Sequence, residues 1–343
     1  MSDKGAEQIK PQAIPKGEYI ADLKRRKLIK TAAAVVAAAT GGGAALLNST
    51  NKAKPEPKRV TPEPTRAANE KQTFREISNQ ILSLKPTSPE RVNLEKNLAG
   101  EVATPEQIDK SLWVISDINI RLDLLNKRYN LRLNGREGLK PLSPEKEAWA
   151  NSKGIHAEAL ALCEESYREA VRIMEILRGK GIFKTDPPAQ RRIMNPGELA
   201  EVLVIESSAG TNTGQTKLVD FFKTFPIETT ALSELAAHTS LITGLDYSSD
   251  RVLGSSTGDM GPFQFRPSTA MEAVSDAAKA GVMLNIFDIS EAGIAALIYL
   301  ASKGYDIDRP EKRKEAVTGW NRDIGKNAKL YESGDDYRQK FSK

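Results

Sequence analysis

A glycine- and proline-rich segment, Gly254–Ala270, restricts the backbone of this chain more than any other stretch. It reads GSSTGDMGPFQFRPSTA. Gly261–Pro262 within it interrupts regular structure and allows the backbone to come close to a ligand. Gln264 follows, with a side-chain amide that can both donate and accept hydrogen bonds. Pro267 then predicts a helix start, with a capping box over Thr269–Glu272. We therefore expect a tight loop that presents one amide and leads into a helix.

A second segment, from Asn195 to Glu206, reads NPGELAEVLVIE and predicts a helix that ends in an acidic residue. Asn195 suits the N-cap, proline follows at the first helical position, and Glu198 suits the reciprocal capping role. The apolar residues of Leu199–Leu203 have helical spacing, and Glu206 continues their stripe. Partial desolvation there would raise the pKa of the carboxyl and keep it protonated, as a general acid requires. The alternative is a glutamate at a frayed helix end, stabilised by water or Ser207.

Taken together, two blocks resemble a known enzyme family. Residues 205–214 (IESSAGTNTG) and 254–269 resemble the lytic transglycosylases of the membrane-bound lytic transglycosylase B type, in the lysozyme-like superfamily. That family pairs a glutamate, a short polar run and an Asn-Thr-Gly-like loop with a later Gly-Ala-Met-Gly-x-x-Gln-Phe-x-Pro-Ser block. The likeness covers residues 195–322, a little over a third of the chain. It implies a mainly α, lysozyme-like catalytic domain over residues 191–343.

The resemblance also implies an activity. A lytic transglycosylase cleaves the β-1,4 bond between N-acetylmuramic acid and N-acetylglucosamine in peptidoglycan glycan strands. The C6 hydroxyl of the muramic acid attacks C1, so one glutamate, here Glu206, serves as acid and then as base and the product is a 1,6-anhydro sugar. No second carboxylate is required, unlike in most glycosidases. Substrate contacts are implied for Ser207, Ser208, Gln264, Phe263, Trp320 and Asn321.

Several positions depart from the family pattern or allow a second interpretation. Asp259 stands where the family has alanine; it is either a loop residue bonded to its own backbone, which we favour, or a second carboxylate. A second carboxylate would make the protein a hydrolytic muramidase. Trp320 replaces a tyrosine and lacks its hydroxyl, and Phe263 could equally be a core residue. The family's calcium loop has no counterpart between Met271 and Asp288, so we expect no metal and no cofactor. A third candidate is a catalytically inactive cell-wall-binding or assembly protein.

The N-terminal residues 1–53 resemble a twin-arginine export signal. Lys24–Lys30 reads KRRKLIK and is followed by Thr31–Leu47, an alanine- and glycine-rich run too weakly apolar for a stable membrane anchor. We therefore expect a periplasmic protein. The net charge of +5 comes from this segment, because the rest of the chain has 41 basic and 41 acidic residues. A neutral body gives no support for nucleic-acid binding. Prolines among charges over residues 54–69 predict an extended linker.

Residues 70–190 predict helices but contain no catalytic motif. A seven-residue repeat over Ile108–Tyr129 predicts a seam between two helices, and one long helix is expected from Ser143 to about Arg178. Cys163, the only cysteine, excludes an intramolecular disulfide and suits the core. This region is either a module that binds cell-wall assembly partners or a wall of the substrate groove, and the sequence leaves both open.

Overall fold

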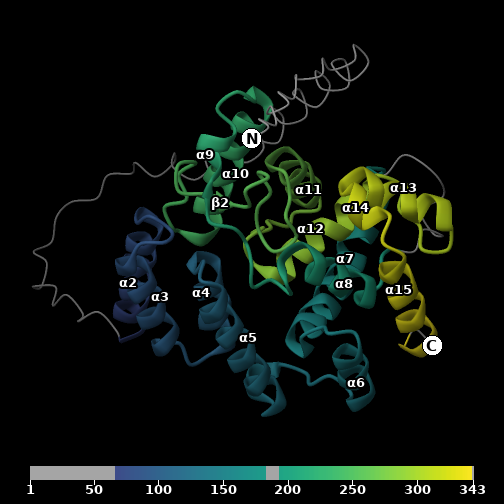
Figure 1. The fold of residues 1–343 in the computed structure, drawn as a ribbon, viewed down its shortest axis with the longest axis horizontal. Helices are drawn as coiled ribbons and strands as arrows, with labels where there is room; N and C mark the ends of the chain where they lie inside the picture. Colours follow the sequence, from purple (N-terminus) through teal and green to yellow (C-terminus); the bar gives the residue numbers. More distant parts are fainter. Residues whose placement is uncertain (1–65, 183–192, 342–343) are drawn as a thin grey trace, which may run out of the picture. The chain divides into compact units, whose positions relative to one another are not determined.

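The computed structural model describes residues 66–182 and 193–341, all of which belong to a unit that begins at Pro57. Helices make up nearly all of the regular structure in these residues (Figure 1), which confirms the prediction of a mainly α protein. The predicted export signal, residues 1–53, lies outside the described residues. The elements are α2 (Arg66–Ser83), α3 (Pro89–Glu101), α4 (Pro105–Val114), α5 (Ile118–Leu133), the 3-10 turn η1 (Arg136–Gly138), α6 (Pro144–Ser152), α7 (Ala157–Gly179), α8 (Pro196–Ser207), β1 (Thr216–Lys217), α9 (Leu218–Phe221), α10 (Pro226–Thr243), β2 (Leu253–Gly254), α11 (Pro267–Lys279), α12 (Ile289–Ser302), α13 (Pro310–Trp320), α14 (Arg322–Gly325) and α15 (Ala328–Phe341).

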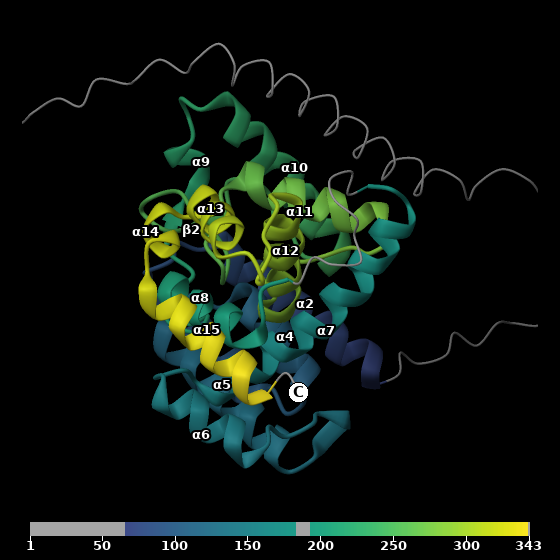
Figure 2. The same ribbon diagram turned by 90° about the vertical axis from the view of Figure 1, so that its right-hand side faces the viewer.

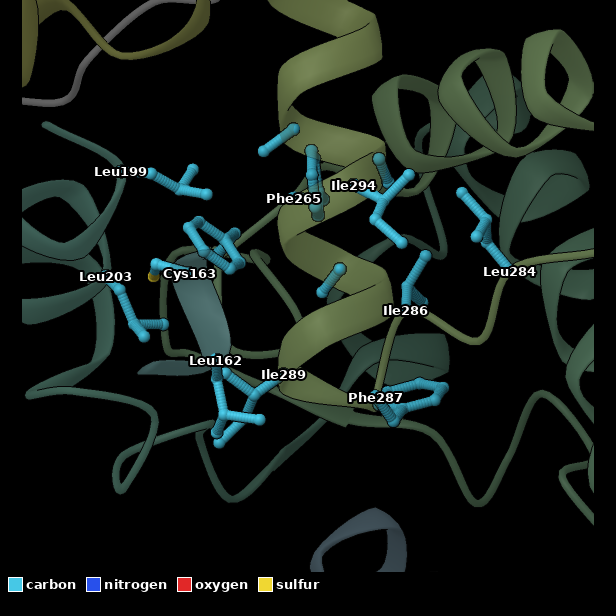
Figure 3. Packing of buried hydrophobic residues seen from close by; sticks show 14 of the residues in the cluster. Leu162, Cys163, Leu199, Leu203, Phe265, Leu284, Ile286, Phe287, Ile289 and Ile294 are labelled. Atoms are coloured by element: carbon cyan, nitrogen blue, oxygen red, sulfur yellow. The ribbon is translucent and has the colours of Figure 1, made fainter. Parts of the chain in front are cut away.

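Helix α12 lies at the centre of the hydrophobic core. Its sequence, ISEAGIAALIYLAS, is apolar on nearly every face, as expected of a helix that is covered on all sides. It packs against α7, α11 and α13. Figure 3 shows Leu199 and Cys163 on one side of this helix and Ile286 on the other, all of them buried. The prediction that Cys163 is a core residue is confirmed.

The contact between α7 and α12 depends on a glycine. A Cβ atom at Gly293 would lie 2.5 Å from the Ser166 Oγ, and that hydroxyl donates to the Ser290 carbonyl at 2.8 Å. Helix α7 also packs against α8, and α8 packs against α15 (Figures 1 and 2). Helices on the two sides of the predicted boundary at residue 190 therefore share one core.

Two predicted boundaries in the N-terminal half are wrong. Residues 54–65 of the predicted linker lie outside the described residues, but residues 66–69 belong to α2, which begins at Arg66 in an alanine-containing segment that favours helix. The long helix expected from Ser143 is two helices, α6 and α7. Gly154 separates them with a φ of +70°, which is accessible to glycine at little cost, and the Ile155 amide donates to the Ala150 carbonyl at 2.9 Å.

The seam predicted over Ile108–Tyr129 is present only in part: α4 packs against α5, and Ile108, Ile115 and Leu125 are buried, but the seven-residue repeat is interrupted. Asp117 caps the N-terminus of α5 by accepting hydrogen bonds from two backbone amides, so a helix break interrupts the seven-residue repeat. Beyond that break, Ile118 and Leu122 are 44% and 40% exposed. The buried face of α5 also includes Arg121, a charged residue that a pattern of apolar residues does not select.

The helix start after the glycine-rich segment is real, but its predicted capping box is not. Helix α11 begins at Pro267 with Arg266 as its N-cap, so Thr269 lies inside the helix and cannot be the N-cap of a capping box. The first turn is capped from α10 instead. Glu228 accepts hydrogen bonds from the Ser268 amide at 3.0 Å and from its hydroxyl at 2.6 Å. A partner from another helix thus supplies the acceptor that local sequence was expected to supply.

Candidate active site

Helix α8 carries Glu206 in its last turn. The capping box predicted at its start is present: the Glu198 amide donates to Asn195 Oδ1 at 3.0 Å, and the Asn195 amide donates to Glu198 Oε2 at 3.4 Å. Leu199 and Leu203 on the inner face have no exposed surface, whereas Glu206 is partly exposed. The helix therefore places this carboxyl at the edge of the core, as the apolar stripe predicts.

The environment of Glu206 favours the protonated carboxyl. Burial raises its pKa to about 7; the hydrogen bond from Asn321 opposes this rise and the charge of Asp259 adds to it. Among the described residues, no lysine or arginine forms an ion pair with this carboxyl. A group with such a pKa can release and take up a proton near neutral pH, as an acid–base catalyst must.

Asn321 has a fixed orientation beside Glu206. Its Nδ2 donates to Glu206 Oε1 at 3.0 Å. Its Oδ1 accepts from the amides of Asp323 and Ile324 at the start of α14, at 3.0 and 3.1 Å. Because the oxygen must face those amides, the nitrogen must face the carboxyl. Asn321 was named from the sequence, and its position is set by the helix that it caps.

The two sequence blocks lie side by side. Strand β1 pairs with β2 in an antiparallel register that joins Thr216 to Gly254. A Cβ atom at Gly214 would lie 2.0 Å from the Gly254 carbonyl carbon, so these two backbones approach as only glycine permits. Residues 205–214 and 254–269 are thereby held together, although 39 residues separate them in the chain.

The Gln264 loop is tight, as predicted. Met260 and Phe265 exchange backbone hydrogen bonds of 2.9 and 2.8 Å, which close the loop between them. Gln264 has a φ of +48°, a strained value for a residue other than glycine, and its Nε2 donates to the Gly261 carbonyl at 2.7 Å. The amide nitrogen thus secures the loop.

Comparison with protein-family models, with curated proteins and with solved structures found no match for this chain. Within residues 66–182 and 193–341, no group of three or more His, Cys, Asp and Glu side chains is placed to hold a metal ion. None of the helices in these ranges is long and apolar enough to cross a membrane.

Asp259 is held by its own loop. Its Oδ1 lies 3.1 Å from the Arg266 Nε, and its Oδ2 accepts from the Thr257 hydroxyl at 2.7 Å. The Asp259 amide also donates to the Ser255 hydroxyl at 3.1 Å. These bonds agree with the favoured loop role, although the carboxylate binds the side chains of Thr257 and Arg266 and not the backbone that we expected. The same carboxylate nevertheless acts electrostatically on Glu206, so it lies near the site.

The two serines after Glu206 differ in position. Ser207 is buried; its hydroxyl donates to the Leu203 carbonyl at 3.1 Å and accepts from the Gly210 amide at 2.9 Å. It therefore shapes the turn and does not face a ligand. Ser208 is exposed and ends the helix in the left-handed region, with a φ of +51°.

Aromatic side chains pack in the core next to the site. Phe263 and Phe265 have no exposed surface, so Phe263 is a core residue and its ring is not available to stack on a sugar. Trp320 stacks on Phe265, with ring centroids 5.5 Å apart and planes at 12°, and is only partly buried. Its indole nitrogen has no hydrogen-bond partner among the described residues. Trp320 is the last residue of α13 and directly precedes Asn321, so this stacking holds that end of the helix against Phe265.

Sequence reasoning missed two arginines next to this site. Arg266 neutralises Asp259 and lies within the motif itself, so its charge beside an unexpected aspartate was a usable signal. Arg121 donates to the Gly210 carbonyl at 2.9 Å from α5. No local pattern could have identified Arg121, because its partner lies in a distant part of the chain.

Proposed function

We propose that this protein is a peptidoglycan lytic transglycosylase. It cleaves the β-1,4 bond between N-acetylmuramic acid and N-acetylglucosamine, with Glu206 as the general acid and base. The observation that carries the proposal is the Glu206 carboxyl itself: partly buried, free of a cationic partner among the described residues, and with its pKa raised to about 7. The resemblance of residues 195–322 to that family supplies the substrate and the reaction.

The proposed reaction uses one carboxyl twice. Protonated Glu206 donates its proton to the glycosidic oxygen as the bond from C1 to that oxygen breaks. The C6 hydroxyl of the muramic acid forms the new bond to C1, and the Glu206 carboxylate removes the proton of that hydroxyl. Each cycle therefore restores the acid and needs no water. A pKa near 7 suits both halves, because neither protonation state is strongly favoured.

The surrounding polar groups suit substrate binding. Asn321 holds one oxygen of Glu206, which leaves the other to face the sugar. The Gln264 amide oxygen and the exposed Ser208 hydroxyl are free to bind sugar or peptide groups, which we propose as their role. Peptidoglycan lies outside the cytoplasmic membrane, so this function also requires export, for which we propose the twin-arginine segment.

Asp259 supports a second candidate, a hydrolytic muramidase. A hydrolase needs a second carboxylate that acts as a nucleophile or activates water. Asp259 lies near enough to raise the pKa of Glu206. Its ion pair with Arg266 and its bond from Thr257 occupy both of its oxygens, however, which makes it a poor nucleophile. We therefore rank this candidate second.

Mass spectrometry of the muropeptides that the purified protein releases from cell walls tests the proposal. We expect 1,6-anhydro ends from wild type. Glu206→Gln should lower release by about a hundred- to ten-thousand-fold, because the amide cannot donate a proton. Asp259→Asn should retain most activity. Glu201→Gln, the same change on the same helix, is the matched control and should behave as wild type.

The products separate the candidates. Reducing ends together with an inactive Asp259→Asn variant would establish the hydrolase. Wall binding without any released muropeptide would indicate an inactive cell-wall-binding protein. Normal release by Glu206→Gln would overturn both enzymatic assignments.

A further inference from the structure

Arg121 is a fully buried arginine that binds backbone carbonyls from three segments. Its Nε donates to the Gly210 carbonyl at 2.9 Å, and its Nη1 donates to the carbonyls of Leu112 at 2.5 Å and Ile115 at 2.9 Å. The first carbonyl belongs to the turn that follows Glu206. The other two belong to the end of α4 and the segment after it.

This arrangement is costly for stability. Arg121 has only 1% of its surface exposed, and its hydrogen-bond partners include no carboxylate. Burial lowers its pKa to about 10; the charge of Glu95 opposes this shift, but Glu95 is already paired with Arg91. Its Nη2 has no partner among the described residues. A buried charge without a paired counter-ion destabilises a fold compared with an apolar side chain of similar size. Stability therefore does not explain an arginine at this position.

The turn that Arg121 holds is strained. Ser208, Ala209 and Gly210 are consecutive residues with φ values of +51°, +63° and +84°. The left-handed region is unfavourable for any residue other than glycine. A turn of this kind persists only when its surroundings stabilise it. The Arg121 guanidinium, bound to the Gly210 carbonyl, supplies one such contact, and the Ser207 hydroxyl, which accepts from the Gly210 amide, supplies another.

This left-handed turn also fixes the C-terminal end of α8. The Ser208 amide donates to the Val204 carbonyl at 2.9 Å, and the Ala209 amide donates to the Leu203 carbonyl at 3.2 Å. Glu206 lies between these residues, so its backbone can move only if those bonds break. A change at the Gly210 carbonyl would therefore reach the carboxyl of Glu206.

We propose that Arg121 is a positioning residue of the proposed catalytic site, which keeps the Glu206 carboxyl partly buried against Asn321 by holding the left-handed turn at Gly210. The inference rests on the proposed function. It also assigns a role within residues 70–190: the corner between α4 and α5 supports the site.

The same corner is attached to the motif region at two further points. Trp113 Nε1 donates to Asp288 Oδ2 at 3.2 Å, and the Tyr247 hydroxyl donates to the Trp113 carbonyl at 2.5 Å. Asp288 caps the N-terminus of the central helix α12. The corner is thus held rigidly, which is what a residue that positions another one requires.

The pKa of Glu206 reports its position without any substrate. The groups that act on this carboxyl are the Asn321 amide and the Asp259 carboxylate, which is paired with Arg266. Arg121 touches none of them, so its removal can change the pKa only through the turn. If the turn relaxes, water reaches the carboxyl and its pKa falls toward the ordinary value for glutamate.

Titration of Glu206 by carbon-detected NMR in Arg121→Met tests this, with Glu206→Gln used to assign the signal. We expect the pKa to fall by about one unit or more. Arg91→Met is the control: Arg91 is equally buried and binds the carbonyls of Leu84 and Val114, and although it also pairs with Glu95, it does not contact residues 208–210. That variant should leave the Glu206 pKa unchanged.

If Arg121→Met does not fold, Arg121→Lys serves instead. Lysine retains the charge but lacks the planar guanidinium, whose N–H groups bind several carbonyls at once. An unchanged Glu206 pKa in the folded variant would overturn the proposal, and so would an equal fall in Arg91→Met. A wild-type protein that releases no muropeptide, together with a lowered pKa in Arg121→Met, would refute the enzymatic function and leave the positioning role intact.

Discussion

At the scale of single residues, the partly buried carboxyl of Glu206 lowers the stability of the fold and is the proposed acid–base catalyst. Its pKa is about 7 in the folded protein and near the ordinary glutamate value in the unfolded chain, mainly because burial disfavours the carboxylate. The folded state therefore binds more protons between these two values, and stability must fall as the pH rises from about 4.5 to 7. Below pH 4.5 the carboxyl is protonated in both states and destabilises the fold little. Above pH 7 it is ionised in both states, and the full loss of stability is present.

Glu206→Gln should remove this cost. We expect the variant to be more stable than wild type at pH 8, by about 1–3 kcal/mol, and nearly equal to it at pH 4.5. The glutamine retains an oxygen to accept the Asn321 hydrogen bond. Denaturant unfolding of both proteins at the two pH values measures the difference, and other titrating groups cancel because both proteins contain them. A variant that is less stable at pH 8 would show that the carboxylate is not desolvated.

At the scale of secondary-structure elements, the α7–α12 contact depends on the missing side chain of Gly293. Gly293→Ala should destabilise the protein by about 1–3 kcal/mol, because the new methyl group overlaps the buried Ser166 hydroxyl and forces the helices apart. Gly100→Ala in α3 is the same change where nothing lies within 4 Å, so it should stabilise by up to about 1 kcal/mol. Thermal unfolding measures both. If both variants change the unfolding temperature in the same direction, helix propensity controls stability at the two sites, and the close approach of α7 to α12 at Gly293 does not.

At the scale of the whole molecule, residues 66–182 and 193–341 share their core, so neither part should be stable alone. Residues 191–343, the domain outlined by the resemblance, lack α7, which covers α8 and α12. We expect this fragment to bind hydrophobic dyes and to unfold without a sharp transition, whereas residues 54–343 should unfold in one cooperative step. Circular dichroism and dye binding test this. A cooperative transition in the isolated fragment would show that the helical region is a separate module.

The sequence by itself determined the local features of this protein. The capping box of α8, the stripe that ends at Glu206 and the closed loop that contains Gln264 depend on residues within a few positions of one another, and each is present as predicted. Such features depend on backbone propensity and short-range hydrogen bonds, which a pattern of residue types records directly. The mainly α content follows from the same kind of pattern.

Only the tertiary structure decided which distant residues meet. The Asn321 amide faces Glu206 because α14 fixes its other side, and Arg121 reaches Gly210 because a break before α5 turns that residue inward. The capping of α11 by Glu228 and the core position of Phe263 have the same origin. These contacts depend on how helices pack, and packing is set by side chains far apart in the chain. A local pattern cannot record such contacts, which is why the partners of Asn321 and the role of Arg121 emerge from the fold alone.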